Sequence, residues 1–382
     1  MYRPSSLARF VILYATLYSA FGVVSPFLPA YFGDRGLTAQ QIALVIGLGT
    51  VVRLVSGPLI GRLADRRRAW RKTLSVCAAG AGVLALGYLL VGGFGPVLLV
   101  GLIQSVLLAP LAPIADAMAL SASLSTVGKR FEYGWVRGSG SAAFIVGSVA
   151  AGQVAASLGL VVSIWLNALL LSIAAFAALL VPNISAEADL HAERTRDLRQ
   201  LLRIRAFRRL LLVGAIVLGS HALHDTFAVI RWRDAGISTA TASLLWSEAV
   251  IAEVVVFLVV GPPLLHRLGP ANAAMLAAGA AVVRWAILGA TTQIAALAVV
   301  EPLHGLTFAF FHLASMQLIG TTVPSPLAAT AQAIYGTLAV GSSTALLTLA
   351  SGSLYTGLDG QAFWVMAILC AGAIPLARRM TR

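Results

Sequence analysis

The chain has 382 residues, of which 59% are hydrophobic and 11% are charged, and its mean hydropathy is +0.90. This balance excludes an ordinary soluble domain and is typical of a polytopic membrane protein. Lysine and arginine outnumber aspartate and glutamate by 27 to 14, a net charge of +13. The two cysteines, Cys77 and Cys370, provide neither a disulfide framework nor the spacing of a metal site.

Apolar segments long enough to cross a bilayer recur along the whole chain. A spanning helix needs about 20 mostly apolar residues to cross a hydrocarbon core of about 30 Å. The sequence predicts twelve such spans, at residues 9–33, 39–61, 73–93, 95–122, 133–157, 159–181, 209–231, 239–264, 271–290, 293–319, 327–354 and 361–378. We therefore expect an all-α polytopic membrane protein with twelve transmembrane helices in two six-helix halves.

The basic residues are unevenly distributed between the predicted loops. Arg35, Arg231 and Arg233 fall in external loops, Arg53, Arg137 and Arg284 fall within spans, and the others lie in the segments on the opposite side. This asymmetry follows the positive-inside rule and predicts that both termini are cytoplasmic. The positive charge therefore indicates orientation in a membrane, and we expect no nucleic-acid partner.

The longest polar segment divides the chain in two. Residues 182–208 are predicted to form a cytoplasmic linker between six-helix bundles at 1–181 and 209–382. Part of this linker, LRQLLRIRAFRRLL, has an amphipathic pattern, and we expect some of it to lie along the membrane surface as a helix. Two six-helix halves about a basic central loop are the layout of transporters whose binding site lies between the halves.

The motif GRLADRRR lies at residues 61–68, between the second and third spans. It resembles the G-x-x-x-D-R-[RK] signature of the major facilitator superfamily, which implies that fold and a transport function. We expect Gly61 to let helices approach closely, and Asp65 to pair with basic residues or with the positive end of a neighbouring helix. Together with Arg66, these residues form the predicted conformational-gating motif.

Two opposite charges fall within neighbouring spans of the first half, Asp116 in span four and Arg137 in span five. A charge at the middle of a membrane costs roughly 2.5–3.5 kcal/mol on insertion scales, so both should face a cavity and pair with each other. A structural ion pair and a substrate-binding pair both fit this pattern. An aromatic face of span one is a candidate wall for an organic ligand, formed by Tyr14, Tyr18, Phe21 and Ser25.

Ionisable residues are concentrated in four spans of the second half: His221, His224, Asp225, Glu248, Glu253, Arg284, Glu301, His304 and His312. Turned at 100° per residue, Glu301, His304 and His312 project within about 80° of one another. Glu248 and Glu253 project about 140° apart, so both cannot face one cavity centre, and we expect Glu253 to face inward. The concentration of these groups predicts a functional site in this half.

The chemistry of these residues predicts coupling of transport to protons. A proton-coupled carrier needs a group whose protonation differs between cavity states, and a carboxylate beside a cation in an apolar site supplies one. The predicted proton-coupling residues are Glu253, Glu301, His304 and Asp225. The predicted substrate-binding residues are Asp116, Arg137, Arg284, His221, His224, His312 and Tyr18. Buried histidines favour protons over sodium, although sodium coupling stays open.

The segments PLAPIADAMAL and FEYGWVRGSGSAAFIVGS, with SHALHDTF and EPLHGLTFAFFH in the second half, resemble the phenylpropionate-porter and lactose-permease branch of the superfamily. The resemblance implies that Arg137 aligns with a substrate-contacting arginine, and that Arg284 and His304 align with a paired arginine and histidine. It also implies a span-eight carboxylate close to Glu253. Two departures concern span ten, where Thr307 replaces a glutamate of lactose permeases and a glutamate instead precedes His304 by three residues.

The leading hypothesis is a secondary transporter, a proton-coupled symporter of a small organic solute such as an aromatic carboxylate, working by alternating access. The alternatives are a drug/proton antiporter working in efflux, which five buried acids against three buried arginines would suit, and a sugar or nucleoside symporter. An intramembrane enzyme is disfavoured because H-E-x-x-H, G-x-S-x-G, Walker and dinucleotide motifs are absent. A receptor on the same fold that binds ligand without transporting it is a further alternative.

The hypothesis carries expectations about partners and location. We expect a monomer in the bacterial inner membrane that crosses the bilayer many times. Its partners are a small-molecule substrate and the lipid bilayer. We expect it to use a proton gradient and no cofactor or metal.

Overall fold

The computed structural model describes residues 6–124, 131–182 and 197–380, and every regular element in these ranges is a helix. The chain divides into two compact units. Unit 1 contains the residues up to Leu190 except Ala39–Gly47, together with Ser238–Ser243, and unit 2 contains the remainder. The part of the predicted linker at 183–196 lies outside the described residues.

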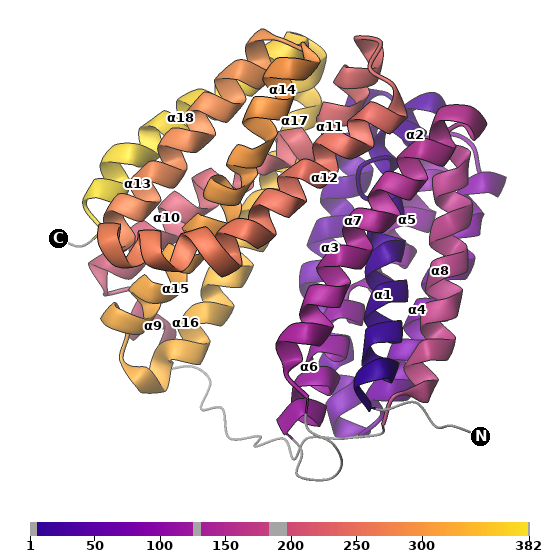
Figure 1. The fold of residues 1–382 in the computed structure, drawn as a ribbon, viewed down its shortest axis with the longest axis horizontal. Coiled ribbons are helices and arrows are strands. Elements are labelled where there is room, and N and C mark those ends of the chain that lie inside the picture. The colour runs from indigo at the N-terminus through magenta and orange to yellow at the C-terminus, as the bar shows by residue number, and fades with distance from the viewer. Residues whose placement is uncertain (1–5, 125–130, 183–196, 381–382) are drawn as a thin grey trace. The chain divides into compact units, whose positions relative to one another are not determined.

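Unit 1 is built from eight described helices, most of them long and apolar (Figure 1), although α3 starts with the residues Ala39–Gly47 that belong to unit 2. They are α1 (Ser6–Val24), α2 (Leu28–Asp34), α3 (Ala39–Arg66), α4 (Trp70–Leu90), α5 (Phe94–Leu108), α6 (Leu111–Leu124), α7 (Tyr133–Leu158) and α8 (Val161–Leu180). Prolines explain two of the breaks, because Pro26 separates α1 from α2 and Pro110 separates α5 from α6. Each of these pairs falls within one predicted span.

Glycines allow α1 to pack closely against α7 in unit 1. A Cβ atom added at Gly147 would lie 2.8 Å from the carbonyl oxygen of Ser19. The Ser19 hydroxyl donates a 3.0 Å hydrogen bond to the carbonyl of Ala143 on α7. Small residues at such a crossing are typical of membrane helices, whose association depends on close packing and on hydrogen bonds between helices. This crossing places Tyr14 and Tyr18 of α1 beside the start of α7.

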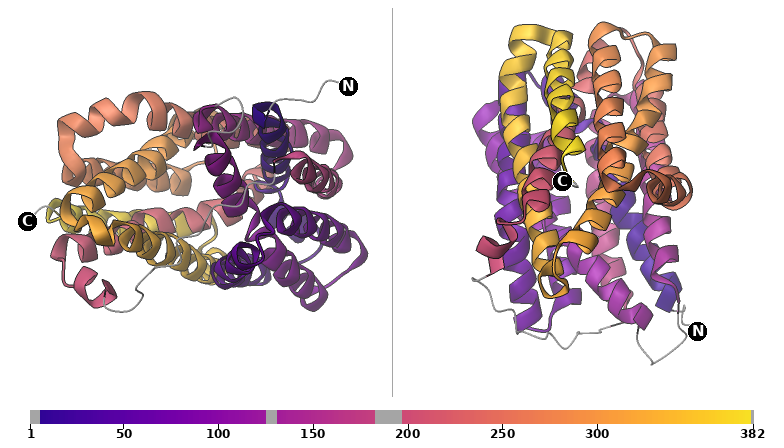
Figure 2. Two further views of the ribbon diagram at one scale, coloured as in Figure 1. Left: turned by 90° about the horizontal axis from the view of Figure 1, so that it is seen from below. Right: turned by 90° about the vertical axis from the view of Figure 1, so that its left-hand side faces the viewer.

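Unit 2 contains more irregular helices than unit 1, with π-helical and 3₁₀ turns between the α-helices. Its helices are α9 (Asp197–Leu201), α10 (Arg205–Gly219), α11 (His221–Asp234), α12 (Thr239–Val255), η1 (Val256–Val260), α13 (Gly261–Ala290), α14 (Ile294–Val300), η2 (Glu301–Leu303), η3 (Gly305–Phe310), α15 (Phe311–Thr322), η4 (Ser325–Leu327), α16 (Ala328–Ile334), η5 (Tyr335–Ser342), α17 (Ser343–Leu358), η6 (Asp359–Gln361) and α18 (Ala362–Arg378). Figure 2 shows α13 and α18, which contact each other extensively, from two further directions.

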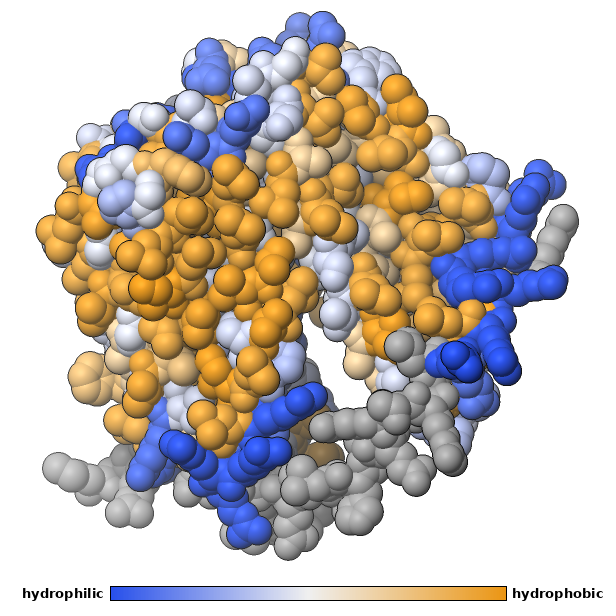
Figure 3. Space-filling view, turned by 180° about the vertical axis from the view of Figure 1, so that it is seen from behind, coloured by the Kyte–Doolittle hydropathy of each residue, from blue (hydrophilic) through white to orange (hydrophobic). Residues whose placement is uncertain are grey.

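Ten helical stretches of the described residues are long and apolar enough to span a membrane. Apolar side chains also cover much of the exposed surface, and Figure 3 shows them over a broad area of one face. A soluble protein rarely exposes so much contiguous apolar surface, and a membrane-facing one does. The prediction of an all-α membrane protein that crosses the bilayer many times is therefore confirmed.

Candidate functional site

The backbone of the tenth predicted span is irregular at the residues of interest. α14 ends at Val300, a 3₁₀ turn covers Glu301–Leu303, and a π-helical turn follows at Gly305–Phe310. Pro302 contributes to this break because it has no N–H to continue the α-helical hydrogen bonds. π-Helical turns are rare and are frequently found at functional sites. Glu301 and His304 therefore lie where the helix changes its winding.

Glu301 and Arg284 form a buried ion pair at the centre of the unit 2 site. Arg284 Nη2 on α13 donates to Oε2 of Glu301 at 2.6 Å, and neither side chain is exposed. His224 Nε2 on α11 lies 3.1 Å from the other carboxylate oxygen of Glu301. The guanidinium also packs over the ring of Trp285, 4.7 Å from its centroid. Pairing of this kind is required because an isolated charge in an apolar interior is very costly.

A second carboxylate reaches the same arginine through a histidine. Arg284 Nη1 lies 3.0 Å from His304 Nδ1, and His304 Nε2 lies 3.5 Å from Glu253 Oε2 on α12. The His304 and Glu253 side chains are 17% and 27% exposed, unlike those of Glu301 and Arg284. Gly305 permits this contact, since a Cβ there would lie 2.7 Å from the carbonyl oxygen of Ala252. Glu253 thus lies beside His304, whereas Glu248 on the same helix is within electrostatic reach of Glu301.

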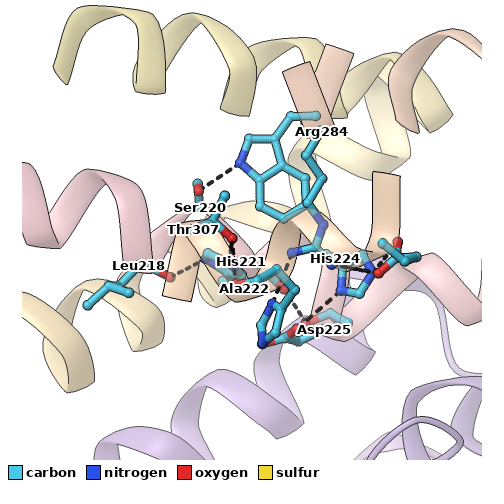
Figure 4. A network of polar contacts seen from close by, with 12 residues as sticks. Leu218, Ser220, His221, Ala222, His224, Asp225, Arg284 and Thr307 are labelled. Atoms are coloured by element: carbon cyan, nitrogen blue, oxygen red, sulfur yellow. Dashed lines mark hydrogen bonds and ion pairs between the residues drawn. The ribbon is translucent and has the colours of Figure 1, made fainter. Parts of the chain in front are cut away.

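His221 is held by hydrogen bonds that define its tautomer. Its Nδ1 lies 3.0 Å from the carbonyl oxygen of Val217 and 3.2 Å from that of Leu218. Because a carbonyl oxygen only accepts, Nδ1 carries the proton. Nε2 lies 2.9 Å from the hydroxyl of Thr307, which can donate to it when the ring is neutral. Figure 4 shows His221, His224 and Arg284 converging from α11 and α13. Thr307 thus offers His221 a neutral hydrogen-bonding group.

Two tryptophans frame the site and were not singled out from the sequence. The Trp246 ring stacks on His224 with centroids 5.2 Å apart. The Trp285 ring meets His221 edge-on at 5.2 Å, and its Nε1 donates to the hydroxyl of Ser220 at 2.9 Å. Trp285 directly follows Arg284, and a tryptophan beside a buried arginine is the available sequence signal. Trp246 carries no signal that separates it from packing residues.

Two predicted site residues, His312 and Asp225, make no direct contact with the buried ion pair among the described residues. The ring of His312 contacts the rings of Phe257 and Tyr335, with centroids at 5.8 and 6.0 Å. His312 follows His304 by eight residues, about 12 Å along a helix axis, so a shared direction does not bring them together. Asp225 is 52% exposed and lies 3.3 Å from His224 Nδ1. Glu248, which was not among the predicted site residues, is half-buried on α12 and lies within electrostatic reach of Glu301.

In unit 1, the expected ion pair between Asp116 and Arg137 is not formed, and that prediction is wrong. Asp116 Oδ1 accepts hydrogen bonds from Tyr14 at 2.5 Å and from Tyr133 at 3.0 Å. Arg137 is exposed and lies over the ring of Tyr18, 5.0 Å from its centroid. Phenol hydroxyls from α1 and α7 therefore satisfy the hydrogen-bonding capacity of the carboxylate. The spacing of residues along α6 and α7 could not predict the partner on α1.

The gating motif differs from the expectation at Gly61. A Cβ added at Gly61 would meet nothing within 4 Å among the described residues, so Gly61 does not mark a close helix approach. Asp65 Oδ1 accepts a 2.5 Å hydrogen bond from the indole Nε1 of Trp70, the first residue of α4, so its partner lies at the N-terminal end of the neighbouring helix, one of the two expected alternatives. Arg66 is exposed at the end of α3. The role of the motif in gating stays a prediction.

No cluster for a metal appears in the described parts of the chain. Within residues 6–124, 131–182 and 197–380, no three His, Cys, Asp or Glu side chains are grouped so that they could hold a metal ion. The site offers a fully buried ion pair, two histidines in contact with it, and a partly exposed carboxylate.

Known transporters resemble this chain along most of its length. A model of the MFS_1 like family matches residues 7–366. The probable 3-phenylpropionic acid transporter of Escherichia coli is 32% identical over 365 residues, which cover 94% of each chain. The uncharacterized transporter YwbF of Bacillus subtilis is 24% identical over 336 residues, 87% of this chain and 83% of the relative.

Solved structures share the fold. A crystal structure of a point mutant of the nucleoside transporter NupG superposes with a TM-score of 0.85 over 99% of both chains, at 18% sequence identity. At that identity the likeness concerns the fold alone. These relatives, found by sequence and by structure, are transporters and not enzymes.

Proposed function

This chain belongs to the MFS_1 like family of transporters, and we propose that it is a secondary active transporter that couples the movement of a small organic solute to protons. The direction proposed is uptake by symport, and the solute class is an aromatic carboxylate. Membership of a transporter family is the premise, and the buried charges of unit 2 supply the coupling chemistry. Two of the acids of unit 2, Glu253 and Glu301, are assigned different tasks.

The observation that carries the proposal is the linked set of contacts from Glu301 through Arg284 to His304 and Glu253. Ionisable residues are rare within membrane-spanning helices, and where they occur they mark ion and proton pathways. Arg284 lies at the centre of the set, in contact with Glu301 directly and with Glu253 through His304. A change in charge at Glu253 or His304 therefore alters the electrostatic interactions of the Arg284–Glu301 ion pair and of His224, which contacts Glu301.

We assign the proton to Glu253 and His304, and the counter-ion of Arg284 to Glu301. Glu301 makes a 2.6 Å contact to Arg284 and is fully buried, so its loss would leave that arginine's charge uncompensated. Glu253 is partly exposed and lies 3.5 Å from His304. It can exchange a proton with water without breaking the buried pair. Asp225, which is also exposed, is a second entry point through His224.

For the solute we propose binding at Arg137 and Tyr18 in unit 1. The guanidinium is exposed and has the paired N–H groups that bind a carboxylate. Tyr18 offers an aromatic ring beside it. A relative that shares 32% of its residues bears the name of a probable transporter of 3-phenylpropionic acid, an aromatic carboxylate. A sugar or nucleoside is the alternative solute class, and an efflux antiporter is the alternative direction.

For the membrane arrangement we propose twelve crossings with both termini cytoplasmic. Two of the ten helical stretches, Thr239–Ala290 and Ser325–Arg378, have 52 and 54 residues. At 1.5 Å per residue each is about 80 Å long, far more than a bilayer core of about 30 Å. Each contains a backbone break, at Gly269 with φ 69° and at Asp359 with φ 49°. Each stretch therefore supplies two crossings.

We further propose that the protein works as a monomer in a bacterial inner membrane. It works by alternating access, with a proton gradient as its energy source. No cofactor, metal or nucleic acid takes part. Its gating motif at Gly61, Asp65 and Arg66 acts on the cytoplasmic side.

The test is solute-dependent proton uptake by proteoliposomes, with 3-phenylpropionate as the first solute. Wild-type protein should acidify the lumen when solute is added outside, equally with and without sodium. Glu253→Gln should abolish proton uptake while exchange of labelled solute persists, and Glu248→Gln, on the same helix, is the matched control. Full coupled uptake by Glu253→Gln would show that the proton assignment is wrong. Sodium dependence, or movement of solute against the expected direction, would select another coupling mode.

A further inference from the structure

Asp116 is held by two phenols that approach the same oxygen. Tyr14 on α1 donates to Oδ1 at 2.5 Å, and Tyr133 at the start of α7 donates to it at 3.0 Å. Hydrogen bonds to an ionised acceptor are stronger than those between neutral groups. Two such bonds fix the direction of the carboxylate and satisfy its charge without a cation. Tyr14 is fully buried, so its ring cannot easily move away.

Arg137 has no carboxylate partner among the described residues. Its Nη1 donates to the hydroxyl of Ser141 at 3.2 Å, and one face of the guanidinium lies over Tyr18. A guanidinium carries five N–H donors, and the described residues accept from this one only at Ser141. The group is exposed, and it is positioned by an aromatic ring and a hydroxyl, neither of which neutralises it.

The same tyrosines that hold Asp116 are placed next to Arg137. Tyr133 precedes Arg137 by four residues on α7, so both project from one face of the helix. Tyr14 stacks on Tyr18 with ring centroids 5.4 Å apart, and Tyr18 in turn lies under the guanidinium. Tyr18 lies within electrostatic reach of both charges. Asp116 and Arg137 are thus linked through only two side chains, the stacked rings of Tyr14 and Tyr18.

We propose that Tyr14 and Tyr133 are positioning residues that keep Asp116 from neutralising Arg137, and so make unit 1 selective for an anionic solute. If the phenols released the carboxylate, it could turn toward the guanidinium and compete with the carboxylate of an aromatic acid. This inference rests on the proposed function, in which Arg137 binds the solute. It adds that the selectivity depends on two hydroxyl groups that do not touch the solute themselves.

A double-mutant comparison tests the role of the hydroxyls. Tyr14→Phe/Tyr133→Phe should raise the dissociation constant for 3-phenylpropionate by roughly fivefold, the scale of one exposed ion pair that the solute must displace. Binding of the uncharged 3-phenylpropanamide should change little. Adding Asp116→Asn to the double variant should restore the affinity for the acid, because the competing charge is gone. Tyr31→Phe is the control, since this residue donates to a backbone carbonyl elsewhere in unit 1.

The reversal by Asp116→Asn separates positioning from simple damage to the fold. If the double variant binds the acid as tightly as wild type, the inference is overturned. It is equally overturned if affinity falls and Asp116→Asn does not restore it, because the tyrosines then act through packing.

A second measurement needs no solute. Phenylglyoxal modifies free guanidinium groups, and peptide mass spectrometry can report its adduct at Arg137. The double variant should be modified several-fold more slowly than wild type, and Asp116→Asn should reverse the change. An unchanged rate would overturn the inference. If wild type fails to bind 3-phenylpropionate while the modification rates change as expected, the proposed solute class is wrong and the action of the tyrosines on Arg137 stands.

Discussion

Arg284 Nη2 lies 2.6 Å from Oε2 of Glu301, and neither side chain is exposed. The pair joins α13 to the irregular turn of the tenth predicted span, and both His224 and His304 contact it. A buried pair of this kind adds little net stability compared with apolar residues, but breaking it by removing one partner is costly. The stability of unit 2 therefore depends on both partners of this contact being present.

Glu301→Gln is expected to lower the free energy of unfolding by about 3–5 kcal/mol, because it leaves the charge of Arg284 buried without a counter-ion. Chemical unfolding in detergent micelles, followed by tryptophan fluorescence, measures the loss. The double variant Arg284→Met/Glu301→Met should recover most of it, since both charges are then removed. A Glu301→Gln variant as stable as wild type would contradict the assignment of Glu301 as the counter-ion.

Thr307→Val should lower the stability of the protein by about 1–3 kcal/mol, because Nε2 of His221 is then buried without a hydrogen-bond donor. Valine has nearly the shape of threonine, so packing is preserved. Thr321→Val is the matched control in α15, because that hydroxyl is exposed and bonds to carbonyls of its own helix. Equal unfolding midpoints for the two variants would show that the contact to His221 contributes nothing.

Gly360→Ala should displace the side chain of Arg231. The guanidinium donates to the carbonyls of Leu288 at 2.6 Å and Gly360 at 2.8 Å, and a Cβ at residue 360 would overlap it. We expect a loss of about 1–3 kcal/mol, the range for overpacking. Gly357→Ala, where a Cβ would meet nothing within 4 Å, should be neutral or slightly stabilising. The losses from Gly360→Ala and Arg231→Gln should not add, as they remove the same contacts.

Gly147→Ala is expected to weaken the packing of α1 on α7 by about 1–3 kcal/mol, because the new Cβ would press on the backbone of Ser19. It would also disturb the hydrogen bond from Ser19 to Ala143. Gly134→Ala in the same helix, which has no neighbour within 4 Å, provides the comparison. Thermal unfolding of the two variants in the same detergent measures the difference, and an equal midpoint would contradict the close packing.

Partner choice within the site could be predicted only in part. The positions of Arg284, His304 and Glu253 followed from the family resemblance, and the structure brings these residues together. The pairing of Asp116 with Arg137 was inferred from their opposite charges and is wrong. Asp116 instead accepts a hydrogen bond from Tyr14, on a helix that is far away in the sequence. A helical projection gives the direction of a side chain but neither its depth nor the identity of its neighbours. His312 shows the same limit, since it faces as His304 does and contacts other residues.

By itself, the sequence determined the class of the protein and the approximate course of its helices, since the length and hydrophobicity of a membrane span are local properties. The motif at residues 61–68 and the segments around Asp116 and Arg137 also identified the superfamily. The tertiary structure decided which groups meet: Glu301 with Arg284, Thr307 with His221, and Asp116 with two tyrosines. Such contacts depend on helix breaks, on π-helical turns and on glycines that let helices approach. These features act between neighbouring helices, so the pattern of residues along a single helix does not reveal which side chains meet.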